Sequence, residues 1–365
     1  PRLALKGSSR TPRALLRSTD RAMSVAPEAA TAAPDGSTCV VLGAGSWGTA
    51  LAIQLARVAL PTLLWGRDST HLAELQRDRR NTRYLPDAPF PEQLRIEPDL
   101  RTALQASRDV IVAVPSHALR GMLQEIAPHL LPHARVAWAT KGFEVATGLL
   151  PHQVAREVLG ESVPTAVISG PTFAREVGAG LPTAMTIAAS DPSYAAELAQ
   201  RFSGQNFRAY TSTDITGVEV GGAIKNVMAI GAGISDGLGF GANTRIALIA
   251  RGLVEMTRLG VALGAKKETF MGLAGLGDLV LTCTDNQSRN RRFGLALASG
   301  ENVDAAQKTI GQVVEGVLAA NAVRSVAQRA GVEMPICEQV YRVVYQGVAP
   351  KDAVKELMSR ALKPE

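Results

Sequence analysis

A short glycine-rich segment between an apolar strand and an apolar helix limits the possible folds of this chain most strongly. Residues 38–42 (TCVVL) form a β-branched, apolar run, and residues 49–60 (TALAIQLARVAL) carry alanine and leucine at helical spacing. Between them, Gly43, Gly45 and Gly48 fit the pattern G-x-G-x-x-G. Such glycines permit a tight turn, approach of the backbone to a diphosphate, and close packing of helix on strand. We expect a β-α-β unit whose helix N-terminus binds a dinucleotide; an ordinary glycine-rich turn is the alternative.

The end of the second strand indicates which dinucleotide binds. An acidic residue there would bind the ribose 2′-hydroxyl and exclude a 2′-phosphate, but the apolar run 62–65 is followed by Gly66, Arg67 and Asp68. Because an arginine can bind a 2′-phosphate through paired hydrogen bonds, we expect NADP to be accepted. Asp68, one residue later, is an acidic residue near the same place, so we expect that NAD can be accepted as well.

Further apolar strands alternate with helical patterns, which predicts an α/β Rossmann-type domain with a doubly wound, mainly parallel sheet over residues 38–212. Ligands of such sheets bind at the carboxyl ends of the strands. Lys141 follows one expected strand and so lies on the cofactor side; an ordinary surface lysine is the alternative. The expected strands lie within residues 109–116, 134–142, 165–172 and 182–190.

From Thr213 onward the strand patterns disappear and helical ones replace them. Residues 243–264, 313–330 and 339–362 all carry apolar side chains at helical spacing. We therefore expect an all-helical C-terminal domain, for substrate binding and catalysis, over residues 213–365.

Charge and composition exclude several classes of protein. The net charge is +6, but residues 1–22 hold six basic side chains and one acidic one, so the rest of the chain is nearly neutral. A nucleic-acid-binding protein would spread basic residues over a folded surface, and no nucleic-acid partner is expected. Residues 1–37 cannot bury enough apolar surface to fold, so we expect a disordered N-terminal extension, with Met23 as a candidate natural start.

The cysteines and the hydropathy pattern indicate a cytoplasmic location. Cys39, Cys283 and Cys337 show no metal-ligand spacing, so neither disulfides nor a zinc site are expected. Since no stretch approaches the ~18 uninterrupted apolar residues of a membrane-spanning helix, we expect no integral membrane segment.

One lysine lies within an unusually apolar helical run. Residues 223–237 read AIKNVMAIGAGISDG and place Lys225 near the expected domain junction. Partial desolvation there would lower the pKa of its ammonium group toward neutrality, which suits a general acid or base. The alternative is a lysine whose stem packs on apolar surface while its head reaches water.

Beyond these patterns, the chain resembles the bacterial-type NAD(P)-dependent sn-glycerol-3-phosphate dehydrogenase family from about Thr38 to about Ala361. The resemblance rests on separate motifs that occur in the family's order and spacing. These motifs are GAGSWGTALA (43–52), SGPTFAREVGAGLPTA (169–184), AIKNVMAIGAGISDGLGFGANTRIALIARGLVEMTRLG (223–260), GLAGLGDLVLTC (272–283), SRNRRFG (288–294) and VVEGV (313–317).

The resemblance implies the reversible reduction of dihydroxyacetone phosphate to sn-glycerol 3-phosphate with NADPH or NADH, which supplies phospholipid synthesis. It makes Lys225 the catalytic residue that exchanges a proton with the C2 oxygen, beside Asp278. Arg289 and Asn290 would hold the substrate phosphate. The implied substrate-binding residues are Lys141, Gly170, Thr172, Lys225, Asn226, Asp278, Ser288, Arg289 and Asn290.

The same resemblance implies a cofactor site that shares Lys141 and Arg289 with the substrate. No metal is required, and a homodimer is expected because the family commonly forms one. The implied cofactor-binding residues are Gly43, Gly45, Ser46, Trp47, Gly48, Arg67, Lys141, Ala174, Arg289, Val313 and Glu315.

Two alternatives differ in their chemistry. A ketopantoate reductase or a β-hydroxyacid dehydrogenase would share the Rossmann and helical domains, but it would not need the phosphate-binding residues of SRNR (288–291). A non-catalytic nicotinamide-nucleotide sensor would keep the glycine pattern, but it would have no use for Lys225, Asp278 and Arg289 together.

Because Arg67 stands where an acidic residue would exclude NADP, we predict that Arg67→Glu weakens NADPH selectively and leaves NADH nearly unchanged. Steady-state titration with each cofactor in turn measures the effect. An equal loss with both cofactors would contradict this role of Arg67.

Overall fold

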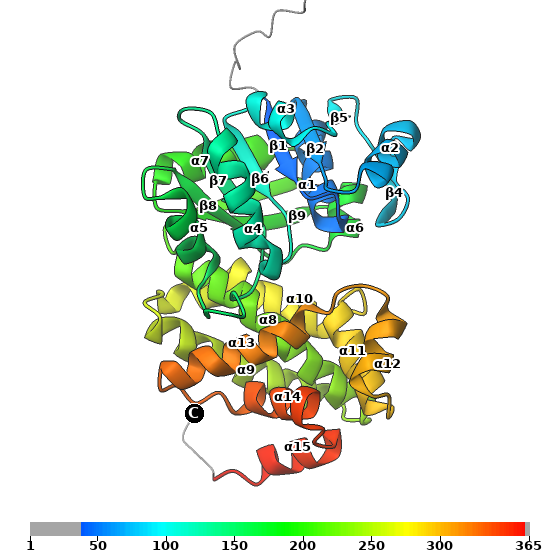
Figure 1. Cartoon of the computed structure of the whole chain (residues 1–365). Coiled ribbons are helices and arrows are strands. Elements are labelled where there is room, and N and C mark those ends of the chain that lie inside the picture. Colours follow the sequence, from blue (N-terminus) through cyan, green and yellow to red (C-terminus); the bar gives the residue numbers. More distant parts are fainter. Residues whose placement is uncertain (1–37, 362–365) are drawn as a thin grey trace, which may run out of the picture. The chain divides into compact units, whose positions relative to one another are not determined.

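The computed structural model describes residues 38–361, in which a sheet region is followed by a helical region (Figure 1). The extension predicted for residues 1–37 lies outside the described residues. All strands expected from the sequence are present, and they join one eight-stranded sheet. The strands of this sheet are β1 (Cys39–Leu42), β2 (Thr62–Trp65), β5 (Leu94–Ile96), β6 (Asp109–Val112), β7 (Arg135–Trp138), β8 (Thr165–Ser169), β9 (Thr183–Ala189) and β10 (Phe207–Ser212).

The sheet has the strand order β10-β9-β8-β7-β6-β1-β2-β5. Every neighbouring pair is parallel except β8 and β9, so the predicted mainly parallel sheet is confirmed. Successive side chains of a strand point to opposite faces, and accordingly Val40 and Val41 are both fully buried but belong to two different hydrophobic clusters. Both faces are covered, which explains the continuous apolar runs of these strands.

Two strands of the sheet have no clear signal in the sequence. β5 has only three residues, and several side chains of β10 are exposed, so neither forms an apolar run. A separate antiparallel hairpin pairs β3 (Arg80–Asn81) with β4 (Leu85–Pro89). β4 contains two prolines, which is tolerated because this hairpin has no further strand to bond.

Helices α1–α7 alternate with the strands, and helices α8–α15 form the C-terminal region predicted to be helical. The last helical stretch expected from the sequence is divided into two helices, because the chain turns at Gly347 in the left-handed conformation (φ +68°) and Pro350 starts the second. Among the helices within residues 38–361, none is long and apolar enough to cross a membrane. The helices are α1 (Ser46–Arg57), α2 (Ser69–Asp78), α3 (Leu100–Gln105), α4 (Ser116–Ile126), α5 (Pro151–Leu159), α6 (Ala174–Ala179), α7 (Pro192–Phe202), α8 (Ile215–Gly237), α9 (Ala242–Ala262), α10 (Asp278–Thr284), α11 (Arg289–Ala298), α12 (Val303–Ile310), α13 (Glu315–Arg329), α14 (Pro335–Gln346) and α15 (Pro350–Met358).

Helix α8 is the central element of the helical region. Every residue from 217 to 235 is buried, and the Asp214 side chain caps the helix by accepting from the Gly217 backbone N–H at 2.9 Å. A β-carbon at Gly233 would lie 2.0 Å from the Arg291 carbonyl oxygen of α11, so glycine is required for these helices to pack this closely. The described residues belong to one compact unit, and the boundary of two domains at 212/213 stays a prediction.

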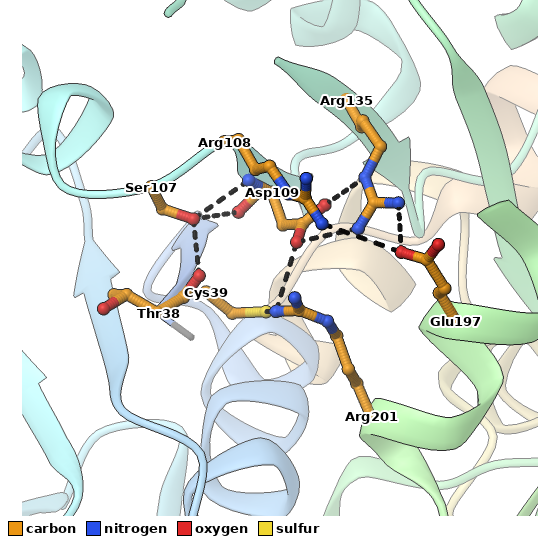
Figure 2. A network of polar contacts seen from close by, with 8 residues as sticks. All are labelled: Thr38, Cys39, Ser107, Arg108, Asp109, Arg135, Glu197 and Arg201. Atoms are coloured by element: carbon orange, nitrogen blue, oxygen red, sulfur yellow. Dashed lines mark hydrogen bonds and ion pairs between the residues drawn. The ribbon is translucent and has the colours of Figure 1, made fainter. Parts of the chain in front are cut away.

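A network of charges around one buried carboxylate joins the amino ends of three strands to α7 (Figure 2). Asp109, the first residue of β6, is fully buried and accepts from the Arg135 guanidinium at 2.6 and 3.0 Å. Arg201 of α7 lies 3.1 Å from the same carboxylate, and Glu197 accepts from Arg135 at 2.5 Å. Because the glycine turn lies at the opposite, carboxyl ends of these strands, the network stabilises the sheet without reaching the candidate site.

We predict that Asp109→Ala lowers the free energy of unfolding by about 3–5 kcal/mol, because the buried Arg135 and the partly buried Arg201 lose their shared carboxylate. Urea denaturation measures the change. The control is Asp78→Ala, which removes an exposed pair with Arg77 and should leave the unfolding midpoint nearly unchanged. Equal midpoints for the two variants would show that the buried network contributes little.

Candidate active site

A cavity of about 1240 Å³ lies at the carboxyl ends of the central strands and is completed by residues of the helical region. Most of the residues that the sequence indicated line this cavity. They are Gly45, Ser46, Trp47, Lys141, Thr172, Ala174, Lys225, Asn226, Ser288, Arg289, Asn290, Val313 and Glu315.

Five indicated residues are not part of the lining. Gly43 (φ +124°) and Gly48 shape the turn, since a β-carbon at Gly48 would lie 1.9 Å from the Gly43 carbonyl oxygen. Gly170 (φ +146°) packs against the Met185 backbone. Asp278 is buried behind two lysines, whereas Arg67 is exposed at the end of β2.

The N-terminus of α1 meets the requirements of a diphosphate site. The helix starts at Ser46, has no acidic residue in its first turn, and presents free backbone N–H groups and the positive end of its dipole. A β-carbon at Gly45 would meet no atom within 4 Å, so the backbone is open to a ligand. The buried indole nitrogen of Trp47 also lacks a hydrogen-bond partner among the described residues. These residues therefore fit a bound dinucleotide.

Two lysines from different regions share one carboxylate in the cavity wall. Asp278, only 1% exposed, is the first residue of α10. Lys141, which follows β7, donates to Asp278 Oδ2 at 2.7 Å. Lys225 of α8 donates to Asp278 Oδ1. This contact joins the sheet region to the helical region and directs two ammonium groups toward the cavity.

Burial sets the proton affinity of this cluster. Desolvation lowers the pKa of Lys225 to about 8; Asp278 opposes this shift, and the ammonium of Lys141 adds to it. Burial also disfavours the charge on Asp278, but the two ammonium groups outweigh burial and lower the pKa of that carboxyl. Lys225 can therefore exchange a proton near neutral pH while Asp278 stays ionised.

A chain of side-chain amides runs beside the lysines. The backbone N–H of Gly316 donates to Asn290 Oδ1 at 2.8 Å, and Asn290 Nδ2 donates to Asn226 Oδ1 at 2.9 Å. Asn226 Nδ2 in turn donates to Glu315 Oε2 at 3.3 Å. Asn290 and Asn226, which the sequence indicated for the substrate, are thus linked by hydrogen bonds to Glu315, which it indicated for the cofactor.

The start of α11 brings a further cation to the cavity. The Ser288 hydroxyl caps this helix by accepting from the Arg291 N–H at 3.2 Å. Arg289 follows directly, is half-buried, and donates to the Gln312 side chain at 3.0 Å. Because this partner is neutral, the guanidinium charge remains available for an anion.

The structure adds cavity residues that the sequence reasoning missed. Thr282 donates to the Asp278 carbonyl oxygen at 2.6 Å. It stands four residues after Asp278, in the region expected to be helical, and this spacing places it on the same helix face. Arg83 and Tyr84 come from the connection between β3 and β4, whose short strands gave no pattern to detect. Arg175 and Arg292 also line the cavity.

A parallel sheet with a glycine turn at its carboxyl edge, completed by helices that carry a buried lysine–aspartate pair, defines a dinucleotide-dependent oxidoreductase. Residues 38–195 match the family described as NAD-dependent glycerol-3-phosphate dehydrogenase N-terminus, and residues 214–355 match NAD-dependent glycerol-3-phosphate dehydrogenase C-terminus. The chain belongs to the NAD-dependent glycerol-3-phosphate dehydrogenase family, as the sequence motifs predicted.

Individual relatives agree with this assignment. A curated glycerol-3-phosphate dehydrogenase (NAD(P)+) of Klebsiella pneumoniae is 59% identical over 326 residues, which cover 89% of this chain and 96% of the relative. A relative of the same description from Aeromonas salmonicida is also 59% identical, over 89% of this chain and 98% of its own length. The crystal structure of glycerol-3-phosphate dehydrogenase from Coxiella burnetii is 48% identical with a TM-score of 0.86, covering 88% of this chain and 99% of that one.

We predict opposite pKa changes when the two neighbours of Lys225 are neutralised. Lys141→Met removes a like charge and should raise the pKa of Lys225 above about 8, whereas Asp278→Asn removes the counter-ion and should lower it. The pH dependence of amine acylation at Lys225, followed by mass spectrometry, reports both shifts. Thermal denaturation verifies folding, and the Lys141 variant alone still tests the cluster if Asp278→Asn unfolds. Unchanged acylation profiles would show that these charges do not govern Lys225.

Proposed function

We propose that this chain catalyses the reversible reduction of dihydroxyacetone phosphate to sn-glycerol 3-phosphate with NADPH or NADH. The observation that carries the proposal is the Lys225–Asp278 pair in a cavity that also contains the α1 N-terminus and Arg289. Both expected ligands are anionic, and the cavity presents separate cationic groups for each.

On the cofactor side, the N-terminus of α1 would compensate the diphosphate charge through its free backbone N–H groups. Trp47 offers its unpartnered indole N–H, and Ser46, Val313 and Glu315 line the same space. When bound, the nicotinamide group supplies or accepts the hydride.

On the substrate side, Arg289 would hold the phosphate through its guanidinium, since its only described partner is the neutral Gln312 side chain. One N–H of Asn290 is engaged by Asn226, which leaves the second amide hydrogen for a phosphate oxygen. Fixing the phosphate at one end of the substrate limits how its C2 carbonyl can lie, so orientation contributes to the rate.

Proton transfer at the C2 oxygen is assigned to Lys225. During reduction that oxygen gains negative charge, which the Lys225 ammonium stabilises before it donates a proton. In the oxidative direction the neutral amine accepts the proton. With a pKa of about 8, the protonated form needed for reduction is lost as the pH rises through this value, and the neutral form needed for oxidation is gained.

The proposed activity also implies a metabolic role, a location and an oligomeric state. We propose that the product supplies phospholipid synthesis, that the enzyme works in the cytoplasm, and that it acts as a homodimer. The cytoplasmic location is supported by Cys39, Cys283 and Cys337, which are all buried and free.

A direct assay tests the proposal. The purified protein is given dihydroxyacetone phosphate with NADPH and with NADH in parallel, and ketopantoate serves as the comparison substrate. Oxidation of either cofactor that depends on dihydroxyacetone phosphate is the expected result. Turnover of ketopantoate alone would instead indicate the related reductase, and tight cofactor binding without any turnover would indicate a sensor.

We predict that Lys225→Ala lowers the turnover number by roughly 10²–10⁴-fold, which is typical of losing a positioned acid or base. Steady-state kinetics measure this change, and cofactor affinity, followed by fluorescence, should barely move. Arg289→Ala is the contrasting variant, because losing a phosphate anchor should mainly raise the KM for dihydroxyacetone phosphate. Retention by Lys225→Ala of more than about a tenth of wild-type turnover, against the ~10²-fold loss expected, would remove Lys225 from the mechanism.

A further inference from the structure

The β3–β4 hairpin is fastened to the glycine turn through one buried side chain. Asn81 is fully buried, and its amide nitrogen lies 3.1 Å from the Ala44 carbonyl oxygen and 2.8 Å from Thr49 Oγ1. Its amide oxygen accepts from the Tyr84 backbone N–H at 3.2 Å. The residues between β3 and β4 are therefore held at a defined place beside the turn.

Packing against α6 secures the other strand of the hairpin. Leu85 and Ala88 of β4 are buried, and a β-carbon at Gly178 would lie 2.7 Å from Leu85 Cδ2. Contact this close leaves β4 little room to move relative to α6. The position of the connection 82–84 is thus set at both of its ends.

Arg83 lies in this connection and carries an uncompensated charge. Its side chain is exposed, lines the same cavity as Gly45, Ser46 and Trp47, and stacks over the Tyr84 ring at 5.1 Å from the ring centroid. No carboxylate pairs with Arg83 among the described residues. Arg175, which also lines the cavity, is instead paired with Asp87 at 3.0 Å.

Two positive features therefore face one end of the cavity. One is the N-terminus of α1, whose first turn contains no acidic residue, and the other is the Arg83 guanidinium. A helix N-terminus and an unpaired guanidinium both favour a phosphate, and a guanidinium can donate two parallel hydrogen bonds to it. Arg67, which the sequence indicated for the 2′-phosphate, is exposed and does not line this cavity.

We propose that Arg83 binds a phosphate group of the dinucleotide cofactor and so contributes to cofactor selection. The proposal rests on the proposed function only in taking the ligand to be a nicotinamide dinucleotide. The 2′-phosphate of NADPH and the diphosphate common to both cofactors share the chemistry that Arg83 recognises, and the experiment separates them.

The test compares Arg83→Ala with the matched control Arg80→Ala. Arg80 is exposed on the same hairpin but does not line the cavity. Dissociation constants for NADPH and NADH are measured by the fluorescence of the reduced cofactor, without substrate. Losing a hydrogen bond to a charged group should weaken binding by about tenfold to hundredfold in Arg83→Ala, whereas Arg80→Ala should bind as the wild type does.

Each outcome decides the proposal. Weaker binding of NADPH alone assigns Arg83 to the 2′-phosphate, and equal weakening of both cofactors assigns it to the diphosphate. Unchanged binding of both cofactors, or equal loss in Arg80→Ala, overturns the proposal. Because binding is measured without substrate, a failure of the wild-type protein to reduce dihydroxyacetone phosphate would refute the proposed function and leave the result on Arg83 intact.

Discussion

The close packing of other segments on α8 is the constraint on which the rest of this structure depends. A β-carbon at Gly221 would lie 2.4 Å from the Ala274 carbonyl oxygen, so the segment leading to Asp278 can approach Lys225 only because glycine stands there. Gly233 faces Gly294 of α11 in the same way, and this contact brings Asn290 beside Asn226. The candidate site thus forms where neighbouring elements contact the backbone of one buried helix.

The electrostatics of the site follow from sharing one carboxylate between two lysines. Burying three charges is expensive, and the cluster retains one excess positive charge while both lysines are protonated. Burial is the main reason why the pKa of Lys225 falls to about 8 although a carboxylate touches it, and the ammonium of Lys141 adds to the shift. Loss of the Lys225 proton leaves the cluster neutral. An anionic ligand would supply the missing counter-charge, so the cluster is arranged for a partner that the protein itself does not provide.

Local patterns predicted the fold well where an element is long or buried on both faces. Val40 and Val41, both buried in the sheet, and the long apolar run of α8 illustrate this. The motifs also indicated Lys225 and Arg289, which line one cavity, and Asp278, which is buried beside Lys225. Arg83 could not be predicted, because it acquires its place from a two-residue strand and from the Asn81 contact to a turn 37 residues earlier. Such long-range contacts leave no periodic signal in a sequence.

The amide chain from Gly316 to Glu315 has a fixed direction, because a backbone N–H can only donate. That donor fixes the oxygen of Asn290, then the oxygen of Asn226, and so presents an amide nitrogen to Glu315. A carboxylate at Asn226 would therefore be set directly against the carboxylate of Glu315, although shape and volume would hardly change. The hydrogen-bond chain thus selects an amide at this position by its charge rather than by its size.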